Sequence, residues 1–114
     1  MDELKKYSRD KLRNILDQND DQVDELMKIF IETTPPLLKE MLDASEQENY
    51  LSCSKIAHRL KSSIQLWDIK HLEDDVFFIE TNGVQSKNTE LINNKIKNLN
   101  TQLLQVIEQM KNEI

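Results

Sequence analysis

The chain has 114 residues, one glycine, two prolines and a formal net charge of −6 at pH 7. This length predicts one domain over residues 1–114, and so few glycines and prolines favour helices joined by short turns over a β-rich fold. The acidic balance argues against nucleic acid as a partner, because such binding rests on neutralising phosphates. No apolar run approaches the ~20 residues of a membrane span and the first residues are acidic, unlike a signal peptide, so we expect a cytoplasmic protein without a membrane partner.

The first helix is expected to begin at Ser8, a good N-cap, and to end near Asn19. Its short apolar stripe consists of Leu12, Ile15 and Leu16. Before it, Leu4 and Tyr7 are placed to cover one end of the core.

The second helix is predicted from Asp20 to Ser45. Pro35 and Pro36 lie in its middle, where proline removes helix hydrogen bonds and clashes with the preceding turn, so a kink or a break is expected at Thr33 and Thr34. The apolar pattern resumes in phase after the prolines, which favours one kinked helix over two. Its expected buried side consists of Val23, Leu26, Met27, Phe30, Leu37, Leu38, Met41 and Leu42.

A third helix is predicted between a cap at Asn49 and an end near Trp67, and at 100° per residue it has two distinct faces. The apolar face carries Ile56, Leu60, Ile64 and Trp67, and the polar face carries Ser54, Lys55, His58, Lys61, Ser62 and Gln65. His58 lies near the middle of the polar face, so it is not a core histidine. Cys53, the single cysteine, predicts neither a disulfide framework nor a metal cluster, and we interpret it as a small reduced thiol.

The neighbours of His58 suit an anionic group. Lys61 at i+3 and Ser62 at i+4 face the imidazole on a helix surface; Lys61 brings an ammonium, and the short Ser62 leaves the ring open to a large partner. Arg59 and Lys55 add positive charge nearby. A neutral histidine is a nucleophile near pH 7, and a phosphoryl group accepts charge-assisted hydrogen bonds from cations. The alternative is an ordinary solvated histidine.

Asp68 is the expected N-cap of a fourth helix, and Gly83 is expected to end it in a left-handed conformation. Its core residues are predicted to be Ile69, Leu72, Val76, Phe77 and Ile79. The last helix opens at residues 88–90. It carries a seam of Ile92, Ile96, Leu99, Leu103, Val106, Met110 and Ile114. Such a seam is either a dimerising coiled coil or the inner face of a bundle helix, and we favour the inner face and a monomer.

Together these helices predict an all-α fold, an antiparallel up-down four-helix bundle with a short extra N-terminal helix. The segment Ala57-His58-Arg59-Leu60-Lys61-Ser62-Ser63 resembles the A-H-x-L-K-G-S signature of histidine-containing phosphotransfer (HPt) domains of two-component phosphorelays. The likeness covers nearly the whole chain: Phe30 and residues 33–38 resemble the second helix of the family, and residues 66–80 match a later stretch, most clearly at Leu72 and Glu80. Ser62 replaces the usual glycine, and residues 67–69 replace Leu-Gly-Ala-like residues.

The resemblance implies the same bundle fold and a role as a phosphorelay intermediate in signal transduction. His58 would accept a phosphoryl group from a receiver-domain phospho-aspartate and pass it to a second receiver, with Lys61 stabilising charge and Gln65 available to hydrogen-bond a phosphoryl oxygen. The partners would be response-regulator receiver domains and possibly a hybrid sensor histidine kinase. The chain would need no cofactor of its own, because the receiver supplies the magnesium.

No autokinase activity is expected, because the chain lacks a glycine-rich phosphate loop. The chain also does not resemble the dimerisation helix of a sensor kinase, in which an acidic residue follows the histidine directly; here Arg59 follows it. The competing hypothesis is a helical-bundle adaptor that binds a receiver or another helical partner without being phosphorylated. His71 lies between Asp68 and Asp74 at metal-like spacing, but the inward Glu-x-x-His pairs of a bundle metal site are absent from the sequence, so we interpret His71 as solvated or as a rim contact for a partner.

Overall fold

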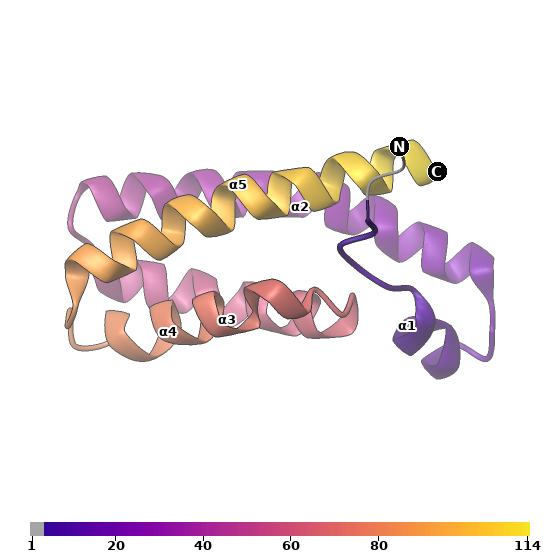
Figure 1. The fold of residues 1–114 in the computed structure, drawn as a ribbon, viewed down its shortest axis with the longest axis horizontal. Coiled ribbons are helices and arrows are strands. Elements are labelled where there is room, and N and C mark those ends of the chain that lie inside the picture. The colour runs from indigo at the N-terminus through magenta and orange to yellow at the C-terminus, as the bar shows by residue number, and fades with distance from the viewer. Residues whose placement is uncertain (1–3) are drawn as a thin grey trace.

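The computed structural model describes residues 4–114 and builds them from helices, with no strand among those residues (Figure 1). The elements are α1 (Asp10–Ile15), α2 (Asp20–Glu46), α3 (Tyr50–Leu66), the short 3-10 helix η1 (Lys70–Leu72), α4 (Glu73–Gly83) and α5 (Thr89–Glu113). The predicted all-α class is confirmed. None of the described helices is both long enough and apolar enough to cross a membrane.

The core lies between the four longest helices. α2 packs against α3 and α5, and α4 packs against the same two helices. From α5 the core receives Ile92, Ile96, Leu99, Leu103, Val106, Ile107 and Met110. These side chains are buried within the chain itself, which confirms the inner-face interpretation of the seam. Ile114, predicted to continue the seam, is exposed because it lies beyond the last helical residue.

α2 runs through Pro35 and Pro36 as one helix, which confirms the preference for one helix over two. Proline cannot donate a helix hydrogen bond. Two residues before Pro35, the Thr33 hydroxyl donates to the carbonyl of Ile29 at 2.8 Å, which adds a side-chain bond next to the proline pair. The buried side of α2 differs from the prediction at Leu26, which is more than a third exposed.

The helix ends depend on left-handed residues that are not glycine. Asp68, predicted to cap α4, has φ 55° and instead ends α3: its N–H bonds the carbonyl of Gln65, and the N–H of Ile69 bonds the carbonyl of Ile64, the two bonds of a Schellman motif. α4 therefore begins only at residue 73, after η1. At the other end, Gly83 is the last residue of α4, as predicted. It has no positive φ, so the predicted left-handed conformation was wrong, and the left-handed residue after α4 is Ser86.

α1 is shorter than predicted. It ends at Ile15 because Asp17 and Gln18, which follow, both have positive φ. Its N-cap residue is Arg9, although the Ser8 hydroxyl does accept the N–H of Asp10 at 3.1 Å. Ile15 is exposed, so α1 anchors itself through Leu12, which is buried, and Leu16, which is half-buried.

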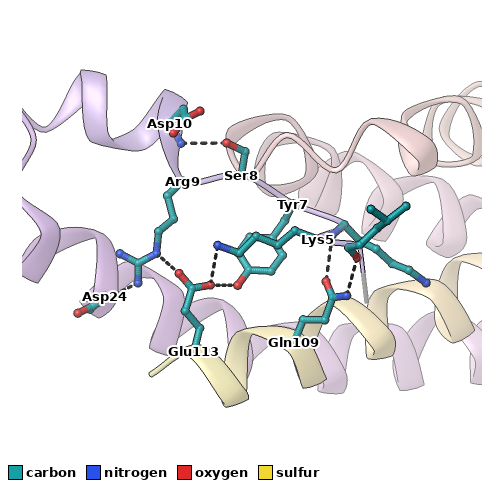
Figure 2. A network of polar contacts seen from close by, with 10 residues as sticks. Lys5, Tyr7, Ser8, Arg9, Asp10, Asp24, Gln109 and Glu113 are labelled. Atoms are coloured by element: carbon teal, nitrogen blue, oxygen red, sulfur yellow. Dashed lines mark hydrogen bonds and ion pairs between the residues drawn. The ribbon is translucent and has the colours of Figure 1, made fainter. Parts of the chain in front are cut away.

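The segment 4–9, which we call the strap, crosses from α1 to the end of α5 (Figure 2). Glu113 is the centre of its charged contacts: the Tyr7 hydroxyl donates to it, and the Arg9 guanidinium contacts it at 2.7 Å while also pairing with Asp24. Tyr7 is buried edge-on against Trp67, with ring centroids 6.4 Å apart. Tyr7 therefore covers the core as expected, whereas Leu4 is almost fully exposed.

Candidate functional site

His58 lies in the middle of α3 with 70% of its side chain exposed, as the helical pattern predicted. The helix begins where the Asn49 side chain accepts the N–H of Ser52 at 3.2 Å, which confirms the predicted cap. Its apolar face, Ile56, Leu60, Ile64 and Trp67, is buried. Because those side chains anchor α3 to the core, the opposite face and His58 are held outward.

α4 approaches α3 very closely beside His58. A Cβ on Gly83 would lie 2.6 Å from the carbonyl oxygen of Tyr50 and 2.9 Å from the Cβ of Ser54, so only glycine fits there. The Ser54 hydroxyl donates to the backbone carbonyl of Glu80 at 2.6 Å. Ser54 was predicted on the polar, exposed face, but it is buried under α4. These contacts fix the register of the two helices and place Glu80 next to His58.

The Glu80 carboxylate links His58 to Lys61. Its Oε2 lies 3.1 Å from His58 Nδ1, and its Oε1 accepts a hydrogen bond from Lys61 Nζ at 2.9 Å. The bond from Lys61 is the main cause that lowers the pKa of Glu80; burial opposes it, and the bond to His58 adds to the lowering. Glu80 is therefore ionised at neutral pH.

This contact decides which nitrogen of a neutral His58 carries the proton. An ionised carboxylate can only accept hydrogen bonds, and a neutral imidazole has one N–H and one bare nitrogen. The Nδ1 that faces Glu80 must then be the donor. Nε2 is left with its lone pair, on a side chain that is mostly open to solvent. The arrangement makes His58 a nucleophile at Nε2, with an anion behind the ring.

Lys61 is held more tightly than a typical surface lysine. About a fifth of its side chain is exposed, and its ammonium lies 5.2 Å from the ring centroid of Phe77. Phe77 was predicted to be in the core, but it is 56% exposed. The inner face of α4 is formed by Val76, Ile79 and Gly83, and Phe77, one residue after Val76, is turned about 100° away from it.

The other predicted site residues stay on the open face of α3. Lys55, Arg59, Ser62 and Gln65 are all exposed. Ser62 leaves the approach to His58 open, and the backbone carbonyl of Gln65 accepts a hydrogen bond from Lys11 at 3.0 Å. Within residues 4–114, Lys61 is the predicted residue that shares a hydrogen-bonding partner with His58.

Sequence reasoning gave Glu80 no role, although the residue was noted as part of the HPt-like stretch. A signal was present: Glu80 follows Ile79 on the face of α4 that also carries Val76 and Gly83, and an acidic side chain beside an apolar stripe needs a cationic partner. The identity of that partner depends on how α3 and α4 pack against each other, and the periodicity of either helix does not predict this packing.

An apolar groove lies between α1, α2 and the end of α3. Its outer part has a volume of about 550 Å³, and its inner part reaches Trp67. Leu26 and Ile29 line both parts, and Leu66, two turns after His58, lines the inner one. All three are partly exposed. These exposed side chains are available to contact apolar side chains of a partner.

His71 and Cys53 take no part in the site. His71 is exposed on η1, and burial, followed by the charge of Lys6, lowers its pKa. Cys53 is fully buried, with its thiol 3.6 Å from the carbonyl oxygen of Met41, and burial raises its pKa. Among residues 4–114 no cluster of three or more histidine, cysteine, aspartate or glutamate side chains is placed to hold a metal ion.

Comparison of the chain with protein-family models, with curated proteins and with solved structures found no match.

Proposed function

We propose that this protein is a phosphorelay intermediate of the HPt type, in which His58 carries the phosphoryl group. The observation that carries the proposal is the contact between Glu80 and His58 Nδ1, which leaves a nucleophilic Nε2 on an exposed ring. The HPt-like segment 57–63 supplies this histidine and Lys61. The packing of α2, α3, α4 and α5 around one core supports an antiparallel up-down four-helix bundle.

The proposed reaction is a transfer in line between two nucleophiles. The Nε2 lone pair of His58 attacks the phosphorus of a phospho-aspartate on a receiver, the phosphorus–oxygen bond breaks, and the aspartate leaves as a carboxylate. The ring then carries the phosphoryl group on Nε2 and a proton on Nδ1, so it is cationic. A second receiver's aspartate attacks the phosphorus in the same way and restores the neutral histidine.

Glu80 and Lys61 act on opposite charges in this scheme. Glu80, 3.1 Å from Nδ1, stabilises the positive charge that develops on the ring as Nε2 forms its new bond. Lys61 is held beside the same ring through Glu80 and is available to the negative phosphoryl oxygens. The receiver would contribute the acidic pocket and magnesium.

The apolar groove supports a docking surface next to His58. Ser62 and Leu66 continue the exposed face of α3 from His58 towards the groove, whose floor includes Leu26 and Ile29. A receiver helix that buries apolar side chains there would bring its aspartate over the histidine. Ser62→Gln should hinder that approach and slow transfer, and unimpaired transfer would contradict the docking geometry.

The test is phosphoryl transfer from a phosphorylated receiver, followed by the stability of the product in acid and base. We expect an acid-labile, base-stable adduct that is lost in His58→Gln and kept in the matched control His71→Gln, since His71 is the other histidine. Labelling that survives in His58→Gln would refute the assignment.

The groove also supports a second candidate, a helical adaptor that binds a partner without accepting phosphate, because its apolar lining does not involve His58. The His58→Gln variant distinguishes the two functions. If His58→Gln abolishes both labelling and signalling but still binds the receiver, the relay function holds. If signalling is unchanged in this variant, the adaptor function is correct.

A further inference from the structure

A second polar site lies away from His58, where the strap meets the turn between α3 and α4. A hollow of about 360 Å³ is lined by Lys5, Lys6, Tyr7, Ser8, Asp68, Lys70 and His71. This volume is at the lower end of the range for small-molecule sites, about 300–1,000 Å³. Three of the lining side chains are lysines and a fourth is His71, in a chain whose net charge is −6. The hollow is therefore a local concentration of positive charge.

The wall that the strap contributes is fixed in place by backbone contacts. The N–H of Ser8 donates to the carbonyl of Trp67 at 2.8 Å. The side-chain amide of Gln109 accepts the N–H of Lys6 at 3.0 Å and donates to the carbonyl of Leu4 at 2.9 Å, as Figure 2 shows. Because the strap is tied down at both ends, its backbone needs little further ordering when the lysines that it carries bind a ligand.

The positive charge in the hollow is only partly neutralised. Lys5 lies 3.5 Å from Glu113, and Asp68, the one acidic residue of the lining, lies 3.8 Å from Lys11. Lys6 donates to the neutral amide of Gln105. No salt bridge involving Lys6, Lys70 or His71 is found among residues 4–114. These three groups are the ones left for an anion.

We propose that this hollow binds a phosphate group, free or as the monoester of a small molecule, between Lys6, Lys70 and His71. The Ser8 hydroxyl contributes a fourth donor: its oxygen accepts the N–H of Asp10, so its own O–H remains free to point at the anion. Three cationic or potentially cationic groups and one hydroxyl match the several acceptor oxygens of a phosphate.

Binding should change the protonation of His71. The charged groups around it are Lys6 on the strap, Asp75 on α4, and the lining residues Asp68 and Lys70. Burial and the charge of Lys6 lower the pKa of His71, while Asp75 raises it. A bound dianion adds negative charge beside the ring and raises this pKa, so phosphate binding and proton uptake at His71 are linked.

The test is an NMR titration of the His58→Gln variant, in which His71 is the one remaining histidine. Inorganic phosphate and glycerol 3-phosphate are added in separate arms at constant ionic strength, with sodium chloride as the blank. We expect a saturable shift of the His71 ring signals and a titration of His71 that moves to higher pH. The arm with the tighter binding identifies the free ion or the monoester as the ligand.

The matched variants are Lys70→Gln, which removes a lining cation, and Lys87→Gln, which removes an exposed lysine of the turn between α4 and α5. Lys70→Gln should weaken binding about fivefold, the size of one exposed charge interaction, and Lys87→Gln should not change it. A shift that is linear, equal in the chloride blank, or unaffected by Lys70→Gln overturns the proposal. Since His58 is absent throughout, the result is independent of the relay function.

Discussion

Replacing Glu80 with glutamine should change which ring nitrogen of His58 carries the proton. The Lys61 ammonium can only donate, so it will take the amide oxygen of the new side chain. The amide N–H groups then face His58 Nδ1, where Glu80 Oε2 lies 3.1 Å away in the parent protein. A donor at this position favours the bare form of Nδ1 and moves the proton to Nε2, which removes the nucleophile.

The size of the effect follows from the exposure of the pair. A hydrogen bond to a charged group contributes about 1.5–3 kcal/mol when it is well buried, whereas exposed ion pairs contribute about 0.2–1 kcal/mol. Glu80 is 22% exposed and His58 is 70% exposed, so the contact lies near the lower range. A value of about 1 kcal/mol corresponds to about a fivefold change in the ratio of the two tautomers, and the rate of phosphoryl transfer should fall by up to the same factor.

Two measurements check this reasoning. Nitrogen-15 NMR of the His58 ring reports the tautomer directly and does not depend on the proposed function; transfer from a phosphorylated receiver reports the rate. Glu108→Gln, an exposed change on α5, is the control and should leave both unchanged. If the ratio of the two tautomers is the same in Glu80→Gln as in the parent protein, the argument from the carboxylate is wrong, even if transfer slows for another reason.

Three further predictions concern stability, each measured as the free energy of unfolding in urea. The pKa of Glu80 is lowered in the folded protein, so this residue contributes to the free energy of unfolding above the ordinary carboxyl pKa of about 4.3, and the contribution is lost as the pH falls through the folded pKa. The difference in the free energy of unfolding between the parent protein and Glu80→Gln should therefore shrink over that pH range. A difference that stays constant with pH would contradict this prediction. Gly83→Ala should destabilise the protein by about 1–3 kcal/mol, because the new Cβ would lie 2.6 Å from the Tyr50 carbonyl oxygen. If the close approach were absent, replacing a helical glycine with alanine would instead stabilise the protein, and that result would contradict the prediction. Leu99→Ala, at a fully buried position, should cost about 2–5 kcal/mol, and its neighbour on α5, the exposed Leu104→Ala, should stay within about 0.5 kcal/mol.

The helices themselves could be predicted from the sequence, because their signals are local. The seam of α5 repeats at spacings of three and four, and nearly all of it is buried. Asn49 caps α3 as expected, and His58 is exposed because Ile56, Leu60 and Ile64 fix the opposite face in the core. These properties follow from the helical period and from the chemistry of one cap.

Helix ends were less predictable, because residue type was a poor guide to the backbone conformation. Asp68 and Ser86 occupy the left-handed positions that end α3 and α4. From the sequence, Asp68 was interpreted as a helix N-cap, and a glycine was expected at the left-handed position that ends α4. Gly83, the one glycine, is required by the close approach of α3 and not by its own φ. Such a close approach depends on two helices together, and neither helix shows a repeating sequence pattern that would predict it.

What the sequence determined by itself is an exposed histidine on an amphipathic helix, with a lysine one turn further along. Only the tertiary structure decided which group faces that histidine. Glu80 is 22 residues away along the chain, and the close packing at Gly83 and the Ser54 hydroxyl bring its carboxylate to Nδ1. The reactive nitrogen is therefore set by the register between two helices, since a hydrogen bond depends on where both partners lie, and the sequence of one helix specifies only one of them.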